Sequence, residues 1–227
     1  MSQPLLETIE IESGDKPAAA VIWMHGLGAD GNDFVPIVHE LDLSGAPAIR
    51  FVFPHAPMQP VSINNGYVMR AWYDVKWGDL EGRSKQADEA GVRASQRAIE
   101  ALIDREVSRG IVAEKILLAG FSQGGAIALH AGLRYSNKLA GVMALSTYLP
   151  LPESFPSEAT EDNRATPIFM AHGTQDNVVP YDMGLRSRQL LEQQGYDVEW
   201  HEYPMPHSVC LEEISDVGAW LRRVLKD

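Results

Sequence analysis

Ser122 stands in the stretch ILLAGFSQGGAIAL, residues 116–129, between an apolar run and a second apolar run with helical spacing. Residues Gly120 to Gly124 fit the pattern G-x-S-x-G, in which a sharp strand-to-helix turn lifts a serine oxygen above the edge of a sheet. Glycine weakens both helices and strands, so three glycines around one serine indicate a turn that needs room. The pattern predicts that Ser122 is a nucleophile.

A nucleophilic serine needs a base that takes its proton and an acid that orients the base. In folds that carry this serine turn, the acid and then the histidine follow the serine along the chain, each after a later strand. Asp176 in HGTQDNVVP and His207 in YPMPHSV stand at those positions. Asp182 and Asp197 are rival acids, but each stands at the start of a predicted element. We therefore predict a catalytic triad of Ser122, Asp176 and His207.

Six other histidines compete with His207 for the role of base. His25, His55 and His172 also follow predicted strands, but each precedes Ser122 or stands before Asp176. Structural hydrogen bonds in tight turns explain these three at least as well as catalysis does. The remaining histidines lie inside predicted helices or strands, where a packed or solvated side chain is the more common finding.

Acyl transfer also needs hydrogen-bond donors for the oxyanion that develops on the attacked carbonyl. One predicted donor is the backbone N–H of Gln123, which follows the nucleophile and begins a predicted helix. The second is the N–H of Leu27 in the sequence HGLG, residues 25–28, after an early strand. Glycines on both sides of Leu27 let that loop approach a substrate closely.

The same loop carries a competing motif, because residues 26–31 read G-x-G-x-x-G after a predicted strand. This is the dinucleotide-binding pattern of an NAD-type oxidoreductase. That pattern requires an acidic residue about 20 residues further on to bind the ribose, and FVFPHAP has none. Asp30 and Asp33 would also repel a pyrophosphate. We expect no cofactor, and the absence of H-E-x-x-H and of a cysteine pair argues against a metal site.

The elements that must position these residues alternate along the chain. Helical spacing of apolar residues predicts helices within 92–110, 181–194 and 211–225. Short apolar runs predict buried parallel strands at 18–24, 49–53, 115–120, 139–146, 166–173 and 197–204. The alternation predicts an α/β fold, a mostly parallel central sheet with helices on both faces, in one domain over residues 1–227. Residues 54–83 and 148–165 are expected to be long loops without elements of their own.

Composition limits the partners. The chain has 227 residues, with 31 acidic against 19 basic side chains and a formal charge of −12. This charge argues against nucleic acid and anionic membrane surfaces as partners. We expect no signal peptide and no membrane anchor, and the lone Cys210 cannot form an intrachain disulfide. Together these features predict a cytoplasmic protein.

With these residues in place, the chain resembles the acyl-protein thioesterase and carboxylesterase family of α/β hydrolases, also called phospholipase/carboxylesterase. The resemblance covers about residues 19–224 and is carried by VIWMHGLGADGNDF, FVFPHAP, PVSINNGYVMRAWYDV, LAGFSQGGAIAL, ALSTYLPL, HGTQDNVVPYDMG and YPMPHS. It implies an α/β-hydrolase fold without a cap domain, and hydrolysis of carboxylic esters or thioesters through an acyl-serine intermediate. It assigns Ser122 as nucleophile, His207 as base and Asp176 as orienting acid, with Leu27 and Gln123 as oxyanion donors. Family members often dimerise, so a homodimer is an expectation.

Substrate contacts are expected chiefly from the loop of residues 57–75, where the family binds acyl chains. The expected partners are a small-molecule or lipid-like acyl ester, or an acylated protein. For any single residue of this loop, packing against the sheet edge explains its apolar character about as well as substrate binding does. Two residues depart from the family pattern, since Tyr148 replaces a common tryptophan and Pro206 precedes His207 where a small residue is expected. A non-catalytic binding protein on the same fold is the contrasting class. The predicted substrate-binding residues are Met58, Ile63, Trp72, Tyr73, Tyr148 and Val178.

Overall fold

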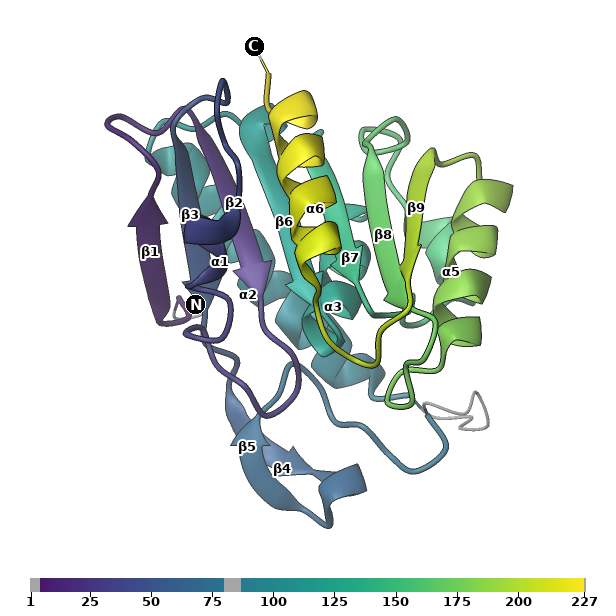
Figure 1. Ribbon diagram of the computed structural model, residues 1–227. Helices are drawn as coiled ribbons and strands as arrows, with labels where there is room; N and C mark the ends of the chain where they lie inside the picture. Colours follow the sequence, from purple (N-terminus) through teal and green to yellow (C-terminus); the bar gives the residue numbers. More distant parts are fainter. Residues whose placement is uncertain (1–4, 80–86, 227) are drawn as a thin grey trace.

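The computed structural model describes residues 5–79 and 87–226 of the chain. The strands of the main sheet are β1 (Thr8–Glu12), β2 (Ala19–Met24), β3 (Ile49–Pro54), β6 (Ile116–Phe121), β7 (Gly141–Leu145), β8 (Ile168–Gly173) and β9 (Val198–Tyr203). Within the described residues they form one seven-stranded sheet in the order β1-β3-β2-β6-β7-β8-β9 (Figure 1). Every neighbouring pair is parallel except β1 and β3, which are antiparallel. The predicted mostly parallel sheet is confirmed.

β1 is the strand of the main sheet that the sequence did not predict. It lies at the edge of the sheet, and its residues alternate between half-buried and exposed. Most of the predicted strands instead consist of consecutive buried residues, as in β2, where all six are buried; β9, at the other edge, is the exception. An edge strand with one wet face carries a weaker apolar signal than a strand covered on both sides.

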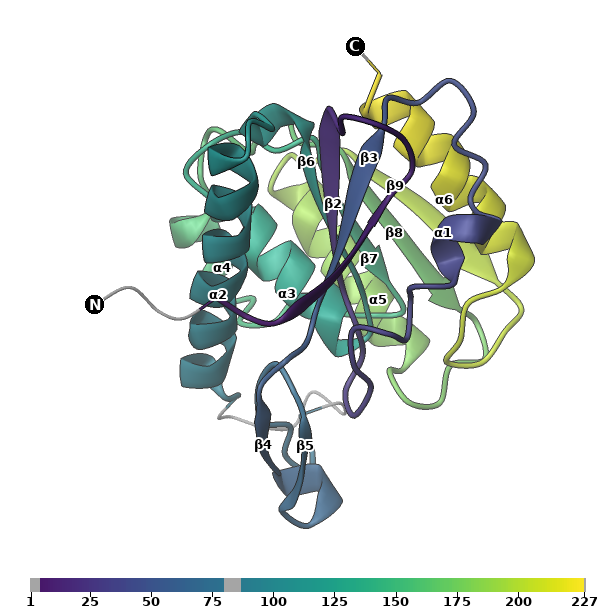
Figure 2. The same ribbon diagram turned by 90° about the vertical axis from the view of Figure 1, so that its left-hand side faces the viewer.

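Helices cover both faces of the sheet, as predicted. Figure 2 shows α1 (Ile37–Glu40) and α6 (Leu211–Val224) on one side of the sheet. On the other side lie α2 (Glu89–Ser108), α3 (Gln123–Gly132) and α5 (Tyr181–Gln193), with the short α4 (Phe155–Glu158) near them. The loops that follow the parallel strands meet at the carboxyl edge of the sheet, where ligands bind in open α/β folds.

The two layers of core follow from the strand period of two. In β2, Ala20, Ile22 and Met24 belong to the apolar cluster beneath α2, α3 and α5. Their neighbours Ala19, Val21 and Trp23 belong to the cluster beneath α1 and α6. Because alternate residues of a strand point to opposite faces, one uniformly apolar hexapeptide supplies both cores.

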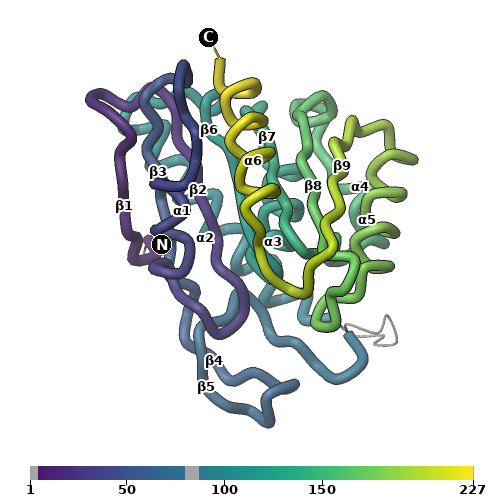
Figure 3. The backbone as a smooth tube through the Cα atoms, in the orientation of Figure 1, coloured from purple at the N-terminus to yellow at the C-terminus, as the bar shows by residue number. Residues whose placement is uncertain are grey.

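The stretch 54–83 is not the loop without elements that the sequence predicted. β4 (Met58–Val61) and β5 (Tyr67–Arg70) pair antiparallel into a hairpin, joined through the 3-10 turn η1 (Ser62–Asn64). Figure 3 shows this hairpin projecting beyond the carboxyl edge of the sheet. Residues 148–165 likewise contain α4, while a second 3-10 turn, η2 (Ala113–Lys115), leads into β6. Both elements of the hairpin are short and largely exposed, so they lack a strong apolar period.

Helix α3 lies unusually close to the sheet. A Cβ atom added to Gly120 would lie 2.3 Å from the backbone of Gly124, and one added to Gly124 would lie 2.3 Å from the carbonyl oxygen of Met24. A Cβ on Gly125 would lie 2.8 Å from the side chain of Thr147. These contacts are shorter than any carbon can tolerate, so the glycines set how deeply α3 enters the sheet.

Candidate active site

The backbone of Ser122 forms the sharp turn between β6 and α3. Its φ is 54° and its ψ is −122°, a conformation that a non-glycine residue rarely adopts. Such a turn costs about 1 to 3 kcal/mol and persists only where surrounding structure holds it. Here the Ser122 N–H donates to the Leu145 carbonyl (2.8 Å), and the Ser122 carbonyl accepts from the Thr147 hydroxyl (2.6 Å). Both partners lie at or just after the end of β7, so this neighbouring strand holds the strained serine.

The structure brings the three predicted triad side chains into one hydrogen-bonded chain. Nε2 of His207 lies 2.9 Å from Oγ of Ser122, and Nδ1 of His207 lies 2.6 Å from Oδ2 of Asp176. His207 reaches this place from the loop between β9 and α6, and Asp176 from the loop after β8. The ring of Phe121 packs on the imidazole with a centroid distance of 4.7 Å. The imidazole is thus held by a ring contact as well as by two hydrogen bonds.

The carboxylate of Asp176 is buried but has several hydrogen-bond donors. Oδ1 accepts from the backbone N–H groups of Val178 and Val179, at 2.8 and 2.9 Å, while Oδ2 faces His207. Burial opposes ionisation, but the bonds from His207 and from the two N–H groups outweigh it and lower the pKa of Asp176. An ionised Asp176 accepts a hydrogen bond from Nδ1–H of His207, which leaves Nε2 free to accept a hydrogen bond from the Ser122 hydroxyl.

The loop of residues 25–28 lies against the nucleophile. A Cβ added to Gly26 would be 3.4 Å from the Cβ of Ser122. His25 holds the loop, because the Ala56 N–H donates to Nε2 (3.1 Å) and Nδ1 therefore donates to the Gly26 carbonyl (2.7 Å). Burial lowers the pKa of His25, so the imidazole stays neutral in this role. The structural interpretation of His25 from sequence agrees with these contacts.

The side chain of Gln123 clamps a distant segment onto the turn. Its Oε1 accepts from the Trp72 N–H, and its Nε2 donates to the Tyr73 carbonyl, both at 2.8 Å. Its own backbone N–H, like that of Leu27, donates no hydrogen bond to any described residue. Sequence analysis predicted the backbone N–H of Gln123 but missed the side-chain clamp. Its partners lie 50 and 51 residues upstream in a stretch without a strong pattern.

A cavity of about 190 Å³ opens beside Ser122. Four of the six predicted substrate-binding residues line it, namely Ile63, Tyr73, Tyr148 and Val178. The complete set of described lining residues is Leu27, Ile63, Asn64, Tyr73, Val75, Ser122, Gln123, Tyr148, Val178 and Val179. The walls are mostly apolar, with Asn64, Ser122, Gln123 and the two tyrosines as the residues that carry polar groups. Such a cavity suits the hydrocarbon part of a ligand.

Two predicted substrate-binding residues do not reach this cavity. Met58 lies on β4 and is 57% exposed. Trp72 is 1% exposed, and its indole N–H donates to the His25 carbonyl at 2.8 Å. Its own carbonyl accepts from the Ser95 hydroxyl, so Trp72 supports the Leu27 loop from below. An aromatic residue in an apolar loop predicts burial as well as ligand contact, and here burial prevails.

The described residues offer little to other kinds of chemistry. No group of three or more histidine, cysteine, aspartate or glutamate side chains in residues 5–79 and 87–226 is arranged to hold a metal ion. The G-x-G-x-x-G residues run through turns, and α1 begins only at Ile37. The strand-loop-helix arrangement of a dinucleotide site therefore does not occur at this loop. A search of the same residues found no helix with the length and apolar character needed to cross a membrane.

The fold and the carboxyl-edge site define an α/β hydrolase. The crystal structure of Arabidopsis thaliana SOBER1 superposes with a TM-score of 0.84 at 33% sequence identity, covering 92% of this chain and 99% of that one. The crystal structure of Zea mays acyl-protein thioesterase 2 gives a TM-score of 0.84 at 29% identity, covering 96% and 99%.

Sequence comparison narrows the class to a family. The family model described as phospholipase/carboxylesterase matches residues 6–225. The acyl-protein thioesterase 1 of Gibberella zeae is 39% identical over 231 residues, which cover 99% of this chain and 98% of that protein. The chain therefore belongs to the phospholipase/carboxylesterase family, and it is a hydrolytic enzyme. The family resemblance of the sequence motifs is confirmed.

Proposed function

We propose that the protein hydrolyses carboxylic esters and acyl thioesters through an acyl intermediate on Ser122. The hydrogen-bonded chain from Asp176 through His207 to Ser122 is the single observation that carries the proposal. Nε2 of His207 takes the proton of the Ser122 hydroxyl while Oγ attacks the substrate carbonyl carbon. Asp176 holds the imidazole in the tautomer that this step requires and stabilises the imidazolium that forms.

The N–H groups of Leu27 and Gln123 serve as donors to the oxyanion. Both flank the cavity beside Ser122, and neither is used by another described residue. Gln123 begins α3, so the helix dipole adds to the stabilisation of negative charge at this point. Removing one such donor from an esterase or protease typically slows turnover by about 100-fold to 1000-fold.

The tetrahedral intermediate breaks down to the acyl-serine when His207 gives its proton to the leaving alcohol or thiol. Water then attacks the acyl carbonyl, His207 takes a proton from the water, and the same proton goes back to Oγ of Ser122 as the free acid leaves. The acyl groups in question include those on proteins, since several relatives are acyl-protein thioesterases. We place the reaction in the cytoplasm, where the lone Cys210 stays reduced.

Replacement of Ser122 by alanine tests the proposal. We expect the hydrolysis of p-nitrophenyl butyrate to fall by at least about 1000-fold. Fluorophosphonate labelling, read by intact mass, should also disappear in this variant. Ser157→Ala is the matched control, since this exposed serine of α4 should keep both activity and labelling. Labelling of wild-type protein at a residue other than Ser122, or substantial turnover by Ser122→Ala, would refute the assignment.

A second panel compares oxygen esters with thioesters of the same acyl group. Both should be hydrolysed by wild-type protein, and both should be lost together in Ser122→Ala, because one nucleophile serves both. Loss of only one activity in that variant would show that the other belongs to a different site.

A further inference from the structure

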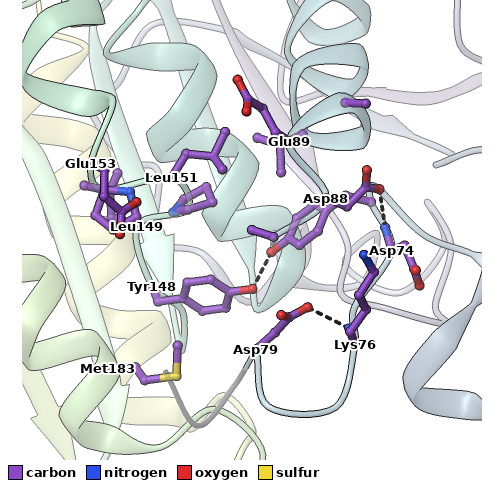
Figure 4. Close-up of a pocket in the computed structure, with 16 residues that line it drawn as sticks. Asp74, Lys76, Asp79, Asp88, Glu89, Tyr148, Leu149, Leu151, Glu153 and Met183 are labelled. Carbon is purple, nitrogen blue, oxygen red and sulfur yellow. Dashed lines mark hydrogen bonds between the residues drawn. The ribbon is translucent and has the colours of Figure 1, made fainter. Parts of the chain in front are cut away.

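Two tyrosines separate the cavity beside Ser122 from a second, larger cavity. Tyr73 and Tyr148 are the only described residues that line both. Their hydroxyl oxygens lie 2.9 Å apart in a hydrogen bond. Figure 4, a close-up of the second cavity, labels Tyr148 and draws the hydrogen bond of its hydroxyl as a dashed line. We call the two side chains the tyrosine wall.

The cavity beside Ser122 lies on the acyl side of the reacting bond. The leaving group must lie within reach of Nε2 of His207, which gives it a proton. The described residues that line the cavity include Ser122 and Gln123 but not His207. A substrate whose carbonyl oxygen faces the N–H groups of Leu27 and Gln123 therefore places its acyl chain in this cavity and its leaving group outside it.

Both tyrosines are fixed to the turn that carries the nucleophile. The Tyr73 carbonyl accepts from the Gln123 side chain. The residue before Tyr148, Thr147, donates to the Ser122 carbonyl, and the residue after it, Leu149, donates from its N–H to the Ser187 hydroxyl at 2.8 Å. Backbone held on both sides of a side chain limits its movement, so the wall keeps a constant distance from Ser122.

The tyrosine wall remains uncharged under working conditions. Burial raises the pKa of Tyr148 to about 12, and the hydrogen bond to Tyr73 lowers it only in part. Burial also raises the pKa of Tyr73 well above its usual range, with Tyr148 and Asp79 adding to the effect. Neutral hydroxyls keep their mutual hydrogen bond, and a group that broke it inside the cavity would leave two hydroxyls without a partner. An alkyl chain offers nothing in exchange for that bond.

The space in front of the wall is small, and the space behind it is charged. The cavity beside Ser122 has a volume of about 190 Å³, against about 810 Å³ for the cavity behind the wall. Behind the wall, apolar side chains such as Leu149, Leu151 and Met183 alternate with charged groups. The charged groups are the carboxylates of Asp74, Asp79, Asp88, Glu89 and Glu153 and the ammonium of Lys76. An alkyl chain that displaced a tyrosine would take water away from these charged groups, which is unfavourable.

We propose that Tyr73 and Tyr148 end the acyl site and restrict the enzyme to esters and thioesters of short acyl groups. The inference rests on the proposed function, because it assigns the cavity to the acyl group bound for Ser122. It makes Tyr148 the residue that determines acyl length, since Tyr73 is 4% exposed and is held by the Gln123 clamp.

A p-nitrophenyl ester series from acetate to dodecanoate, below micelle-forming concentrations, tests the wall. For wild-type protein we expect kcat/KM to be highest among the short esters and to be at least tenfold lower for decanoate than for butyrate. Tyr148→Ala should raise the decanoate-to-butyrate ratio of kcat/KM by about tenfold, since each methylene accepted contributes about fourfold. Tyr148→Leu shortens the wall while keeping its apolar part and should change the ratio in the same direction. Tyr148→Phe keeps the bulk of the wall and should leave the ratio within about threefold of wild type.

The outcomes separate the two proposals. Equal wild-type kcat/KM for butyrate and decanoate would refute the proposal that the tyrosine wall limits acyl length, and this result needs no variant. An unchanged ratio in a folded, butyrate-active Tyr148→Ala or Tyr148→Leu would overturn it as well, with folding checked by near-ultraviolet circular dichroism. Failure of wild-type protein to hydrolyse any ester in the series, or of Ser122 to label, would instead refute the proposed function.

Discussion

Asp176 and Glu213 are two buried carboxyl groups in opposite states. The side chain of Asp176, in the loop after β8, and that of Glu213, on α6, both have an exposure of 0%. Asp176 accepts hydrogen bonds from His207 and from two backbone N–H groups, and its pKa is lowered. Among the described residues, neither oxygen of Glu213 has a hydrogen-bond partner of normal geometry. Burial raises its pKa to about 8, which the nearby Cys210 backbone opposes only in part.

The comparison shows that donors, and not depth, decide the charge of a buried acid. At neutral pH Asp176 is a carboxylate and can orient an imidazole. Glu213 is mostly a neutral carboxylic acid at the same pH, and it serves α6 as a polar group inside an apolar layer. Substitution of each acid tests this difference in charge, and substitution of Gln123 tests hydrogen-bond donors elsewhere in the site.

Asp176→Asn should have the largest effect, because it removes the charge while keeping the shape. An amide can hold His207 in the wrong tautomer, so we expect kcat for p-nitrophenyl butyrate to fall by about 1000-fold to 10,000-fold. Asp197→Asn is the matched control, since this rival acid is exposed and precedes β9. Its kcat should equal that of wild type. A loss of activity in Asp197→Asn alone would reverse the assignment of the acid.

Gln123→Ala tests the donors that hold the site from outside the triad. The Trp72 N–H and the Tyr73 carbonyl lose their partners, at a cost in unfolding free energy of about 1 to 3 kcal/mol for each group left unsatisfied. We expect kcat/KM to fall by about 10-fold to 100-fold, because Leu27 and Tyr73 lose their support. Gln123→Glu keeps an acceptor for Trp72 but turns a carboxylate oxygen toward the Tyr73 carbonyl oxygen at a buried position, so urea denaturation should find it no more stable than Gln123→Ala. Wild-type stability and kcat/KM in Gln123→Ala would contradict the clamp.

Glu213→Gln should leave activity at pH 7 unchanged and alter only how stability depends on pH. The folded pKa of Glu213 is raised, so the native state holds a proton that the unfolded chain releases between about pH 4.5 and 8. Wild-type stability contributed by this group is therefore complete below about pH 4.5 and declines as pH rises toward 8. The glutamine has no proton to lose. The Tm of the variant minus that of wild type should increase by several degrees from pH 5 to pH 8.5. A constant difference across this range would show that Glu213 is not neutral in the folded protein.

Strong local signals explain what could be predicted from sequence. Apolar runs, most of them uniform, predicted the six parallel strands, although the run that became β9 is mixed. The rule that loops after parallel strands share one edge predicted that Ser122, Asp176 and His207 would meet. β1 and the β4–β5 hairpin were missed because their residues are exposed on one side or more. The Gln123 clamp and the burial of Trp72 could not be predicted, since both depend on how residues 71–75 pack against the turn after β6. No periodicity records a contact between segments 50 residues apart.

The close approach of α3 to the sheet also affects how a mutational scan of this enzyme would be interpreted. At Gly120 and Gly124 any side chain meets backbone atoms at 2.3 Å, so every substitution should be depleted under selection for activity. Gly45 and Gly66 have a positive φ but no atom within 4 Å of an added Cβ, so Asn and Asp should survive there. A heat map of tolerated residues would therefore score Gly120 and Gly124 with the triad. Their intolerance reports the depth of a helix and not contact with a substrate.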